Sequence, residues 1–158
     1  MNKAIISKNN ERLKYLYMLI SLWIGYLFCC VLFLVYSIFP TSKKKKGDII
    51  FFPYTQPGSD GYKRRIGQFE AFLENDRLKY KVCSIFDDPT IISGLEGGNA
   101  SCFRLYRKIF WKRLGQIPDV SRYDSVFIQR GLFPMYPDQR FPFLEKLAFK
   151  LNKNITID

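Results

Sequence analysis

Three consecutive basic residues, Lys63, Arg64 and Arg65, follow a loop that is rich in glycine and proline. This loop, Tyr54 to Gly61, comes directly after the apolar run Ile49 to Phe52, which has the composition of a strand buried on both faces. Ligands of open α/β sheets bind where a strand crosses to the next helix. Cations beside such a crossing therefore predict a site for an anion.

Several other chemistries are excluded or unsupported. Histidine is absent, which excludes an imidazole base, a serine–histidine pair and a histidine-containing zinc site. The cysteines have neither the Cys-x-x-Cys spacing of a metal site nor the pattern of a disulfide framework. Buried or membrane-facing thiols in a reducing compartment are the simpler interpretation. We predict no metal centre and no cofactor.

The adjacent carboxylates Asp87 and Asp88 follow a predicted strand. Such a pair can serve acid–base or metal chemistry. Neighbouring acids at a strand end are more often solvated or capping groups, and the sequence leaves both interpretations open.

The chain is strongly basic, with 25 lysines and arginines against 14 acidic residues and a formal charge of +11. This balance favours phosphate-bearing substrates, nucleic acid or acidic lipid as partners. The basic residues are scattered over several elements and form no known nucleic-acid reader motif. We therefore predict membrane lipid, and not nucleic acid, as a partner.

The N-terminal region divides into a basic tail (1–14), a segment without charged residues (15–39) and a polybasic linker (40–47). A helix over 15–39 would be roughly 37 Å long, enough to cross a hydrocarbon core of about 30 Å. The segment is too long for a signal peptide, and no small-x-small cleavage site precedes Lys43. We predict a retained single-pass transmembrane helix.

The orientation of this helix is a tie by the positive-inside rule, because four basic residues stand on each side of it. A compact lysine run after the span suits a cytoplasmic surface rich in anionic lipid, although it could also be a solvated linker. On the first interpretation the soluble part is cytoplasmic. The candidate lipid-facing residues of this run are Lys43, Lys44, Lys45 and Lys46.

The remainder, 48–158, alternates strand-like and helix-like patterns. Strand, helix and strand within about 40 residues form a right-handed parallel crossover by default. We therefore predict one α/β domain, a Rossmann-like parallel sheet with flanking helices, with Ser59 or Asp60 capping its first helix. The predicted strands are 49–52, 80–86, 123–129 and 155–157, and the predicted helices are 63–75, 100–114 and 143–151.

The helix over 100–114 has two possible roles. Its apolar stripe could pack into the core of the domain, or the helix could lie on a membrane surface with its basic flanks toward lipid headgroups. The candidate headgroup-binding residues are Arg104, Arg107, Lys108 and Lys112.

Three segments carry a resemblance to a known family. Residues 57–69 resemble a Tyr-Arg-Tyr-Arg-Ile-x-Gln loop and helix, and 123–134 resemble a Tyr-Asp-Val-Val-Phe-x-Gln-Arg-x-x-x-Pro strand. Residues 155–158 resemble the start of an Asp-Phe-Asp-Asp segment. Over 48–158 the chain thus resembles the N-terminal, acceptor-side half of bacterial GT-B glycosyltransferases of family 4 or the family 1-like group.

The resemblance implies a function and a set of cleft residues. Intact members transfer a sugar from a nucleotide-sugar donor to a cell-envelope glycan or lipid-linked acceptor. The donor-binding lobe of the family has no counterpart in this sequence, so we expect a truncated lobe that is inactive alone and needs a second lobe to bind donor and acceptor. A non-catalytic membrane-bound module that binds anionic lipid or a partner protein is the alternative. The matched cleft candidates are Tyr62, Arg65, Gln68, Gln129 and Arg130.

The chain departs from the family pattern in two places. Lys63 and Arg64 replace an Arg-Tyr pair, and Gly131 stands where an acidic residue is common. The resemblance therefore assigns no catalytic carboxylate to this turn.

Overall fold

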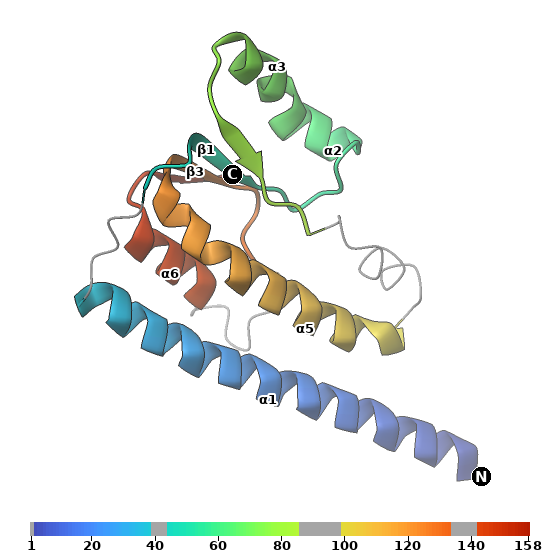
Figure 1. The fold of residues 1–158 in the computed structure, drawn as a ribbon. Helices are drawn as coiled ribbons and strands as arrows, with labels where there is room; N and C mark the ends of the chain where they lie inside the picture. The colour runs from blue at the N-terminus through green and yellow to red at the C-terminus, as the bar shows by residue number, and fades with distance from the viewer. Residues whose placement is uncertain (1, 39–43, 86–98, 134–141) are drawn as a thin grey trace.

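The computed structural model describes residues 2–38, 44–85, 99–133 and 142–158, and the side chains from 12, 44, 105 and 142 onward within them. Four parallel strands form one sheet in the order β2-β1-β3-β4, which confirms the predicted α/β class (Figure 1). The strands are β1 (Gly47–Phe52), β2 (Tyr80–Val82), β3 (Tyr123–Ile128) and β4 (Ile155–Ile157).

Helices cover both faces of the sheet, as Figure 1 shows. One face carries α2 (Asp60–Tyr62), a π-helical turn (Lys63–Gly67) and α3 (Gln68–Asn75), which follow one another without a break. The other face carries α5 (Asn99–Gln116), a 3₁₀ turn (Ile117–Arg122) and α6 (Phe143–Leu151). Beyond α5 and α6 lies α1 (Asn2–Ile38), as a further layer.

The alternating directions of side chains on β1 divide the core into two clusters. Ile50 and Phe52 are fully buried under α5 and α6, and Phe51 packs with Ile66 and Leu73 beneath α3 on the opposite face. A strand with apolar residues on both faces needs cover on both, which is why the continuous run forms the centre of a parallel sheet.

Within the α/β domain, two predicted boundaries differ from the structure by three residues or more. The first helix begins at Asp60, because the Ser59 hydroxyl accepts a hydrogen bond from the Tyr62 backbone N–H at 3.3 Å. β2 ends at Val82, short of the predicted 86. The N–H of Cys83 still donates to the Phe51 carbonyl, but its own carbonyl accepts from a buried arginine, so the ladder stops.

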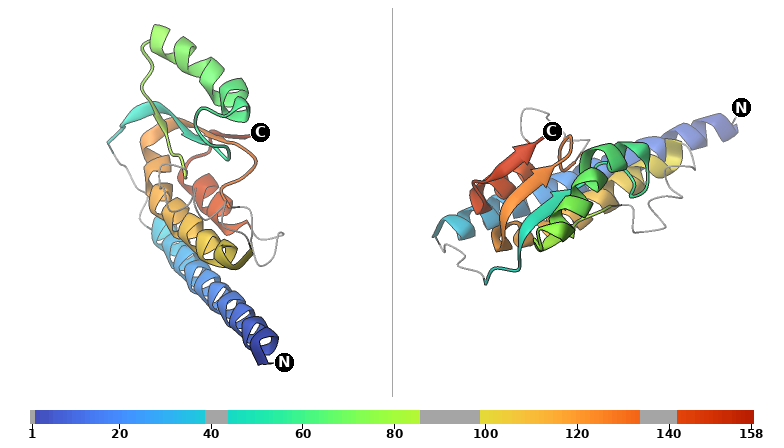
Figure 2. Two further views of the ribbon diagram at one scale, coloured as in Figure 1. Left: turned by 90° about the vertical axis from the view of Figure 1, so that its right-hand side faces the viewer. Right: turned by 90° about the horizontal axis from the view of Figure 1, so that it is seen from above.

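The apolar helix α1 lies beside α5 and α6 in both views of Figure 2. Met18, Leu22 and Cys29 on its inner side are buried in the same core cluster as the residues of β1. By length and composition, the part from Arg12 to Ile38 could cross a membrane. The helix begins at Asn2, so the basic tail and the apolar segment are continuous.

Candidate functional site at the carboxyl edge of the sheet

The loop after β1 and the turn after β3 are joined by one buried side chain, Gln129. Its Oε1 accepts hydrogen bonds from the Tyr54 backbone N–H at 3.0 Å and from the Thr55 hydroxyl at 3.2 Å. Its own backbone N–H donates to the Phe52 carbonyl at 3.1 Å, continuing the ladder. Only 1% of Gln129 is exposed, so this residue shapes the floor of the site and does not reach outward from it.

Arg65 and Arg130 meet at Asp158, which follows β4. The backbone N–H of Arg130 donates to the Asp158 carbonyl at 2.8 Å, and the Arg65 guanidinium forms an ion pair with the Asp158 carboxylate. Arg130 is an exposed non-glycine residue with φ of +61°, a backbone conformation that persists only where surrounding contacts enforce it. The hydrogen bond to Asp158 is one such contact.

A π-helical turn places Arg65. The sequence predicts an uninterrupted helix over 63–75, and the structure instead has π-helical bonding from Lys63 to Gly67. Such turns are rare and occur frequently at functional sites. Here the turn lies between the Ser59 cap and α3, and Arg65 on it is only half exposed and contacts the end of β4.

The other two cleft candidates do not join this group. Tyr62 is buried under α3, and its hydroxyl donates to Glu70 Oε1 at 2.6 Å. Burial and then the hydrogen bond to the carboxylate raise the pKa of Tyr62 well above its ordinary value. Gln68 is exposed on α3. The structure thus brings together Arg65, Gln129 and Arg130, and gives Tyr62 a packing role.

Two buried charged residues that sequence reasoning missed support the same edge. Arg113 of α5 is 1% exposed, and its guanidinium donates to the carbonyls of Pro53, at 2.6 Å, and Cys83. Glu145 of α6 accepts from the Leu132 backbone N–H at 2.6 Å. Arg113 interrupts an apolar stripe between Phe110 and Leu114, and that interruption was the only signal in the sequence.

The arrangement suits an anion better than a metal ion. Arg65 and Arg130 both contact Asp158 at the carboxyl edge of the parallel sheet, Arg65 through its guanidinium and Arg130 through its backbone N–H. Within the described ranges, no group of three or more metal-ligating side chains is present. Asp87 and Asp88, the other carboxylates considered for metal chemistry, lie outside the described residues.

The lysine run after α1 contacts the opposite, amino edge of the sheet. Lys45 forms ion pairs with Asp48 and Asp124, and Lys46 pairs with Asp119 at 3.4 Å. Lys44 is exposed, whereas Lys43 lies outside the described residues. Of the three lysines that the structure describes here, Lys45 and Lys46 are therefore engaged within the domain.

The basic residues of α5 differ in their surroundings. The Arg107 guanidinium lies over the Tyr17 ring of α1, 5.0 Å from its centroid. Lys108 is exposed and Lys112 is half buried, and the Arg104 side chain lies outside the described part. Because Phe110 and Leu114 are buried in the core, the core-helix interpretation of α5 is confirmed for these residues.

Asp119 forms ion pairs with three basic side chains at the amino edge of the sheet. It pairs with Lys46, with Lys81 at 2.6 Å and with Arg122 at 3.4 Å. Partial burial alone would favour the protonated carboxyl, but the hydrogen bond from Lys81 and the charges of Lys81 and Lys46 outweigh it, so the pKa of Asp119 is lowered.

We expect Asp119→Asn to lower the free energy of unfolding at pH 7 by about 1 kcal/mol, a modest value because Lys81 and Lys46 are 41% and 48% exposed and solvent screens them. A lowered folded-state pKa stabilises above the unfolded pKa of about 3.9, and this stabilisation disappears as pH falls further. Urea unfolding should therefore show a smaller difference between wild type and variant at pH 3 than at pH 7. An equal difference at both values would contradict the electrostatic explanation.

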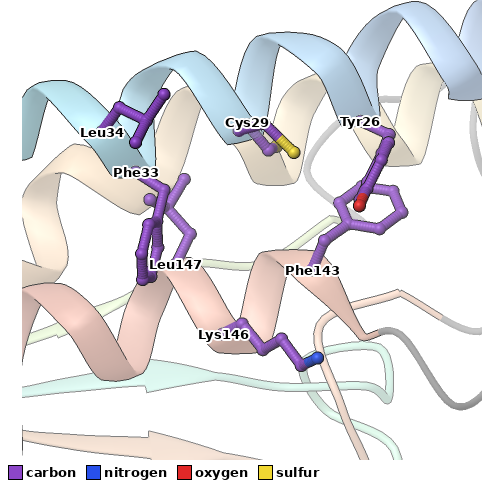
Figure 3. Close-up of a pocket in the computed structure, with 8 residues that line it drawn as sticks. Tyr26, Cys29, Phe33, Leu34, Phe143, Lys146 and Leu147 are labelled. Atoms are coloured by element: carbon purple, nitrogen blue, oxygen red, sulfur yellow. The ribbon is translucent and has the colours of Figure 1, made fainter.

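A groove lies between α1 and α6, and it shares no lining residue with the candidate site at the carboxyl edge of the sheet. Its volume is about 370 Å³, and its lining includes Tyr26, Phe33, Phe143 and Leu147, with Lys146 as its charged residue (Figure 3). The lining is almost entirely apolar. The groove therefore suits a hydrocarbon group better than a sugar or a nucleotide.

Models of known protein families, curated proteins and solved structures were compared with this chain, and none of them matches it.

Proposed function

We propose that the chain is the acceptor-side lobe of a membrane-anchored glycosyltransferase of the GT-B type. A second lobe binds the nucleotide-sugar, and this lobe holds the acceptor, a cell-envelope glycan or a lipid-linked molecule, to which the sugar is transferred. One observation supports this proposal above the others: Arg65, Gln129 and Arg130 come from the two segments that resemble the family, and they gather at one edge of the sheet.

The proposed chemistry is recognition of a phosphate-bearing ligand. Guanidinium groups form strong, directional hydrogen bonds with phosphate oxygens. Arg65 and Arg130 would orient an anionic acceptor, or the diphosphate of the donor, across the cleft. In the structure Asp158 neutralises Arg65, so an incoming anion has to compete with this carboxylate. Gln129 keeps the loop after β1 in place beneath the ligand.

Membrane attachment is the second part of the proposal. α1 is long and apolar enough to meet the hydrocarbon region, and the sheet domain would then lie on the cytoplasmic side. An enzyme that acts on a lipid-linked acceptor needs its cleft close to the membrane surface, and attachment through α1 provides this.

A test uses the full chain in a mild non-ionic detergent and farnesyl diphosphate as the probe. We expect Arg65→Gln and Arg130→Asn each to raise the dissociation constant about tenfold or more, since a hydrogen bond to a charged group contributes about 1.5–3 kcal/mol. Asparagine is chosen at 130 because it tolerates the left-handed conformation. Isothermal titration calorimetry measures the change.

Arg64→Gln is the matched control, because Arg64 is an exposed arginine on the same π-helical turn. It should leave the dissociation constant unchanged. Equal weakening by all three variants would indicate non-specific charge attraction, and an absence of binding by the wild type would contradict the anion site.

A non-catalytic membrane-bound module is the alternative. The observation that favours it is the apolar outer side of α1 beside basic residues of α5 and α6. Under this alternative the chain binds vesicles of anionic lipid but shows no affinity for the diphosphate probe. The calorimetric test therefore separates the two functions.

A further inference from the structure

The helix α1 has two apolar stripes with different surroundings. The inner stripe recurs at alternating intervals of four and three residues and faces α5 and α6. Its members are Met18, Leu22, Gly25, Cys29, Leu32 and Tyr36. The outer stripe lies on the opposite side, where every member is exposed. It consists of Leu16, Ile20, Trp23, Leu27, Val31 and Ile38.

Close contacts hold the inner side of α1 to the domain. The Gly25 backbone lies against the Phe110 ring, so near that a Cβ at this position would be 2.1 Å from the ring. Nearby, the Trp111 indole N–H donates to the Ser21 hydroxyl at 3.2 Å. Contacts of this kind along the helix make α1 part of the folded body.

Cations flank the outer stripe on both sides. Arg107 of α5 lies over the Tyr17 ring on one side, and Lys150 of α6 lies 5.3 Å from the centroid of the Phe33 ring on the other. Lys146 of α6 stands at the groove beside the same helix. An apolar stripe with lysine and arginine along its borders matches a bilayer surface, where hydrocarbon lies beneath anionic headgroups.

A transmembrane orientation conflicts with this packing. If α1 crossed the bilayer while in contact with α5 and α6, then Arg107, Lys112, Lys146 and Lys150 would enter or border the hydrocarbon. Charged side chains in that region carry a large free-energy cost. An orientation parallel to the membrane leaves the contacts intact, places the outer stripe in the acyl region and keeps the cations at headgroup level.

We propose that α1 lies in the plane of an anionic membrane, with its outer stripe immersed, while its inner stripe stays packed on α5 and α6. This arrangement departs from the single pass predicted from the sequence. It rests on the membrane attachment in the proposed function but not on the glycosyltransferase activity. The apolar groove between α1 and α6 adjoins the immersed side and accommodates part of a lipid acyl chain.

Cysteine labelling tests the orientation. The four native cysteines are replaced by alanine in the full chain, and one cysteine is introduced by Asn9→Cys or Lys44→Cys, at opposite ends of the apolar segment. The chain is added to preformed, sealed vesicles of phosphatidylglycerol and phosphatidylcholine, and a membrane-impermeant maleimide is applied outside. We expect both positions to be labelled completely without detergent. Protection of either position until detergent is added would overturn the inference.

Substitutions on the outer stripe provide a second measurement. Leu27→Glu with Val31→Glu should reduce cosedimentation with the same vesicles more than tenfold and leave the circular dichroism spectrum unchanged. Phe72→Glu is the matched control, because Phe72 is also an exposed apolar residue, 59% accessible, but lies on α3 across the sheet. Equal loss with Phe72→Glu would contradict a lipid-binding role specific to α1.

The experiments distinguish a failure of this inference from a failure of the proposed function. If the wild-type chain does not bind vesicles, both this inference and the proposed membrane attachment are wrong. If it binds with positions 9 and 44 on opposite sides of the bilayer, the attachment stands and the in-plane orientation is wrong. The affinity for the diphosphate probe decides the catalytic part of the proposed function separately.

Discussion

Replacing Arg113 with methionine should lower the free energy of unfolding by about 3 kcal/mol or more. The guanidinium donates to the carbonyls of Pro53 and Cys83, and its plane lies near the Phe52 ring, 5.4 Å from the centroid. Each hydrogen bond from a charged group contributes about 1.5–3 kcal/mol, and methionine would leave both buried carbonyls without this donor. Urea unfolding in a mild detergent, followed by circular dichroism, measures the change.

The control for this prediction is Lys108→Met, which removes an exposed cation from the same helix. It should alter the free energy of unfolding by no more than about 0.5 kcal/mol. Arg113→Lys keeps the charge, but a single ammonium group cannot match the fork of the guanidinium, so we expect an intermediate loss. If Arg113→Met were as stable as the wild type, water or another donor would have to satisfy the carbonyls.

The same residue connects stability to the proposed site. Arg113 holds the end of β1 at the Pro53 carbonyl, and Gln129 holds the following residue, Tyr54, through its backbone N–H. The two side chains reach adjacent residues of one loop from a helix and from a neighbouring strand. This double support fixes the loop before any ligand arrives, as preorganised binding requires. Loss of Arg113 should therefore weaken binding of the diphosphate probe as well as stability.

Local patterns were sufficient to predict the alternation of strands and helices. The apolar run Ile49 to Phe52 and the 3.6-residue period of 143–151 each depend on neighbours in the sequence, and both elements occur as predicted. The gathering of Arg65, Gln129 and Arg130 at one edge was predictable in part, since strand ends meet at one edge of any parallel sheet. What these patterns cannot show is which side chains turn inward, as the burial of Tyr62 and Gln129 illustrates.

Arg113 and the π-helical turn show why other features of the structure could not be predicted from the sequence. A basic residue on an amphipathic helix is solvated by default, and Arg113 is buried only because α5 crosses the ends of β1 and β2. That crossing is a tertiary property. The π-helical turn likewise leaves no mark in the apolar period of 63–75, because Ile66 and Leu73 remain on the buried side.

The packing of α1 against the domain could not be predicted from the sequence, for a different reason. Its residues are apolar all round, so composition predicts burial in lipid and cannot separate an inner stripe from an outer one. Gly25 is the one residue of α1 whose type indicates, once the structure is known, which side of the helix is packed. A glycine in the middle of a long apolar helix permits close approach of another element, and here Phe110 occupies the space beside it. The same residue provides the sharpest test of whether α1 is packed on the domain.

Gly25→Ala should destabilise the contact between α1 and α5 by about 2 kcal/mol. The added methyl group would lie 2.1 Å from the Phe110 ring, and that ring cannot move freely because Phe133 and Phe143 pack against it with centroids 5.5 and 5.6 Å away. Inserting a carbon into such a core typically costs about 1–3 kcal/mol. The measurement is the rate at which a maleimide modifies Cys29, in a background in which Cys30, Cys83 and Cys102 are replaced by alanine.

Gly115→Ala is the matched control, since Gly115 lies on α5 and a Cβ added there would have no atom within 4 Å of it. Alanine there should be neutral or stabilise by up to about 0.5 kcal/mol, because it favours the helix more than glycine does. Cys29 is 3% exposed, so its modification reports release of α1. Faster modification in Gly25→Ala than in Gly115→Ala shows that α1 is held by this contact. Equal and rapid modification in the wild type would show a detached helix, which could then cross the membrane independently of the domain.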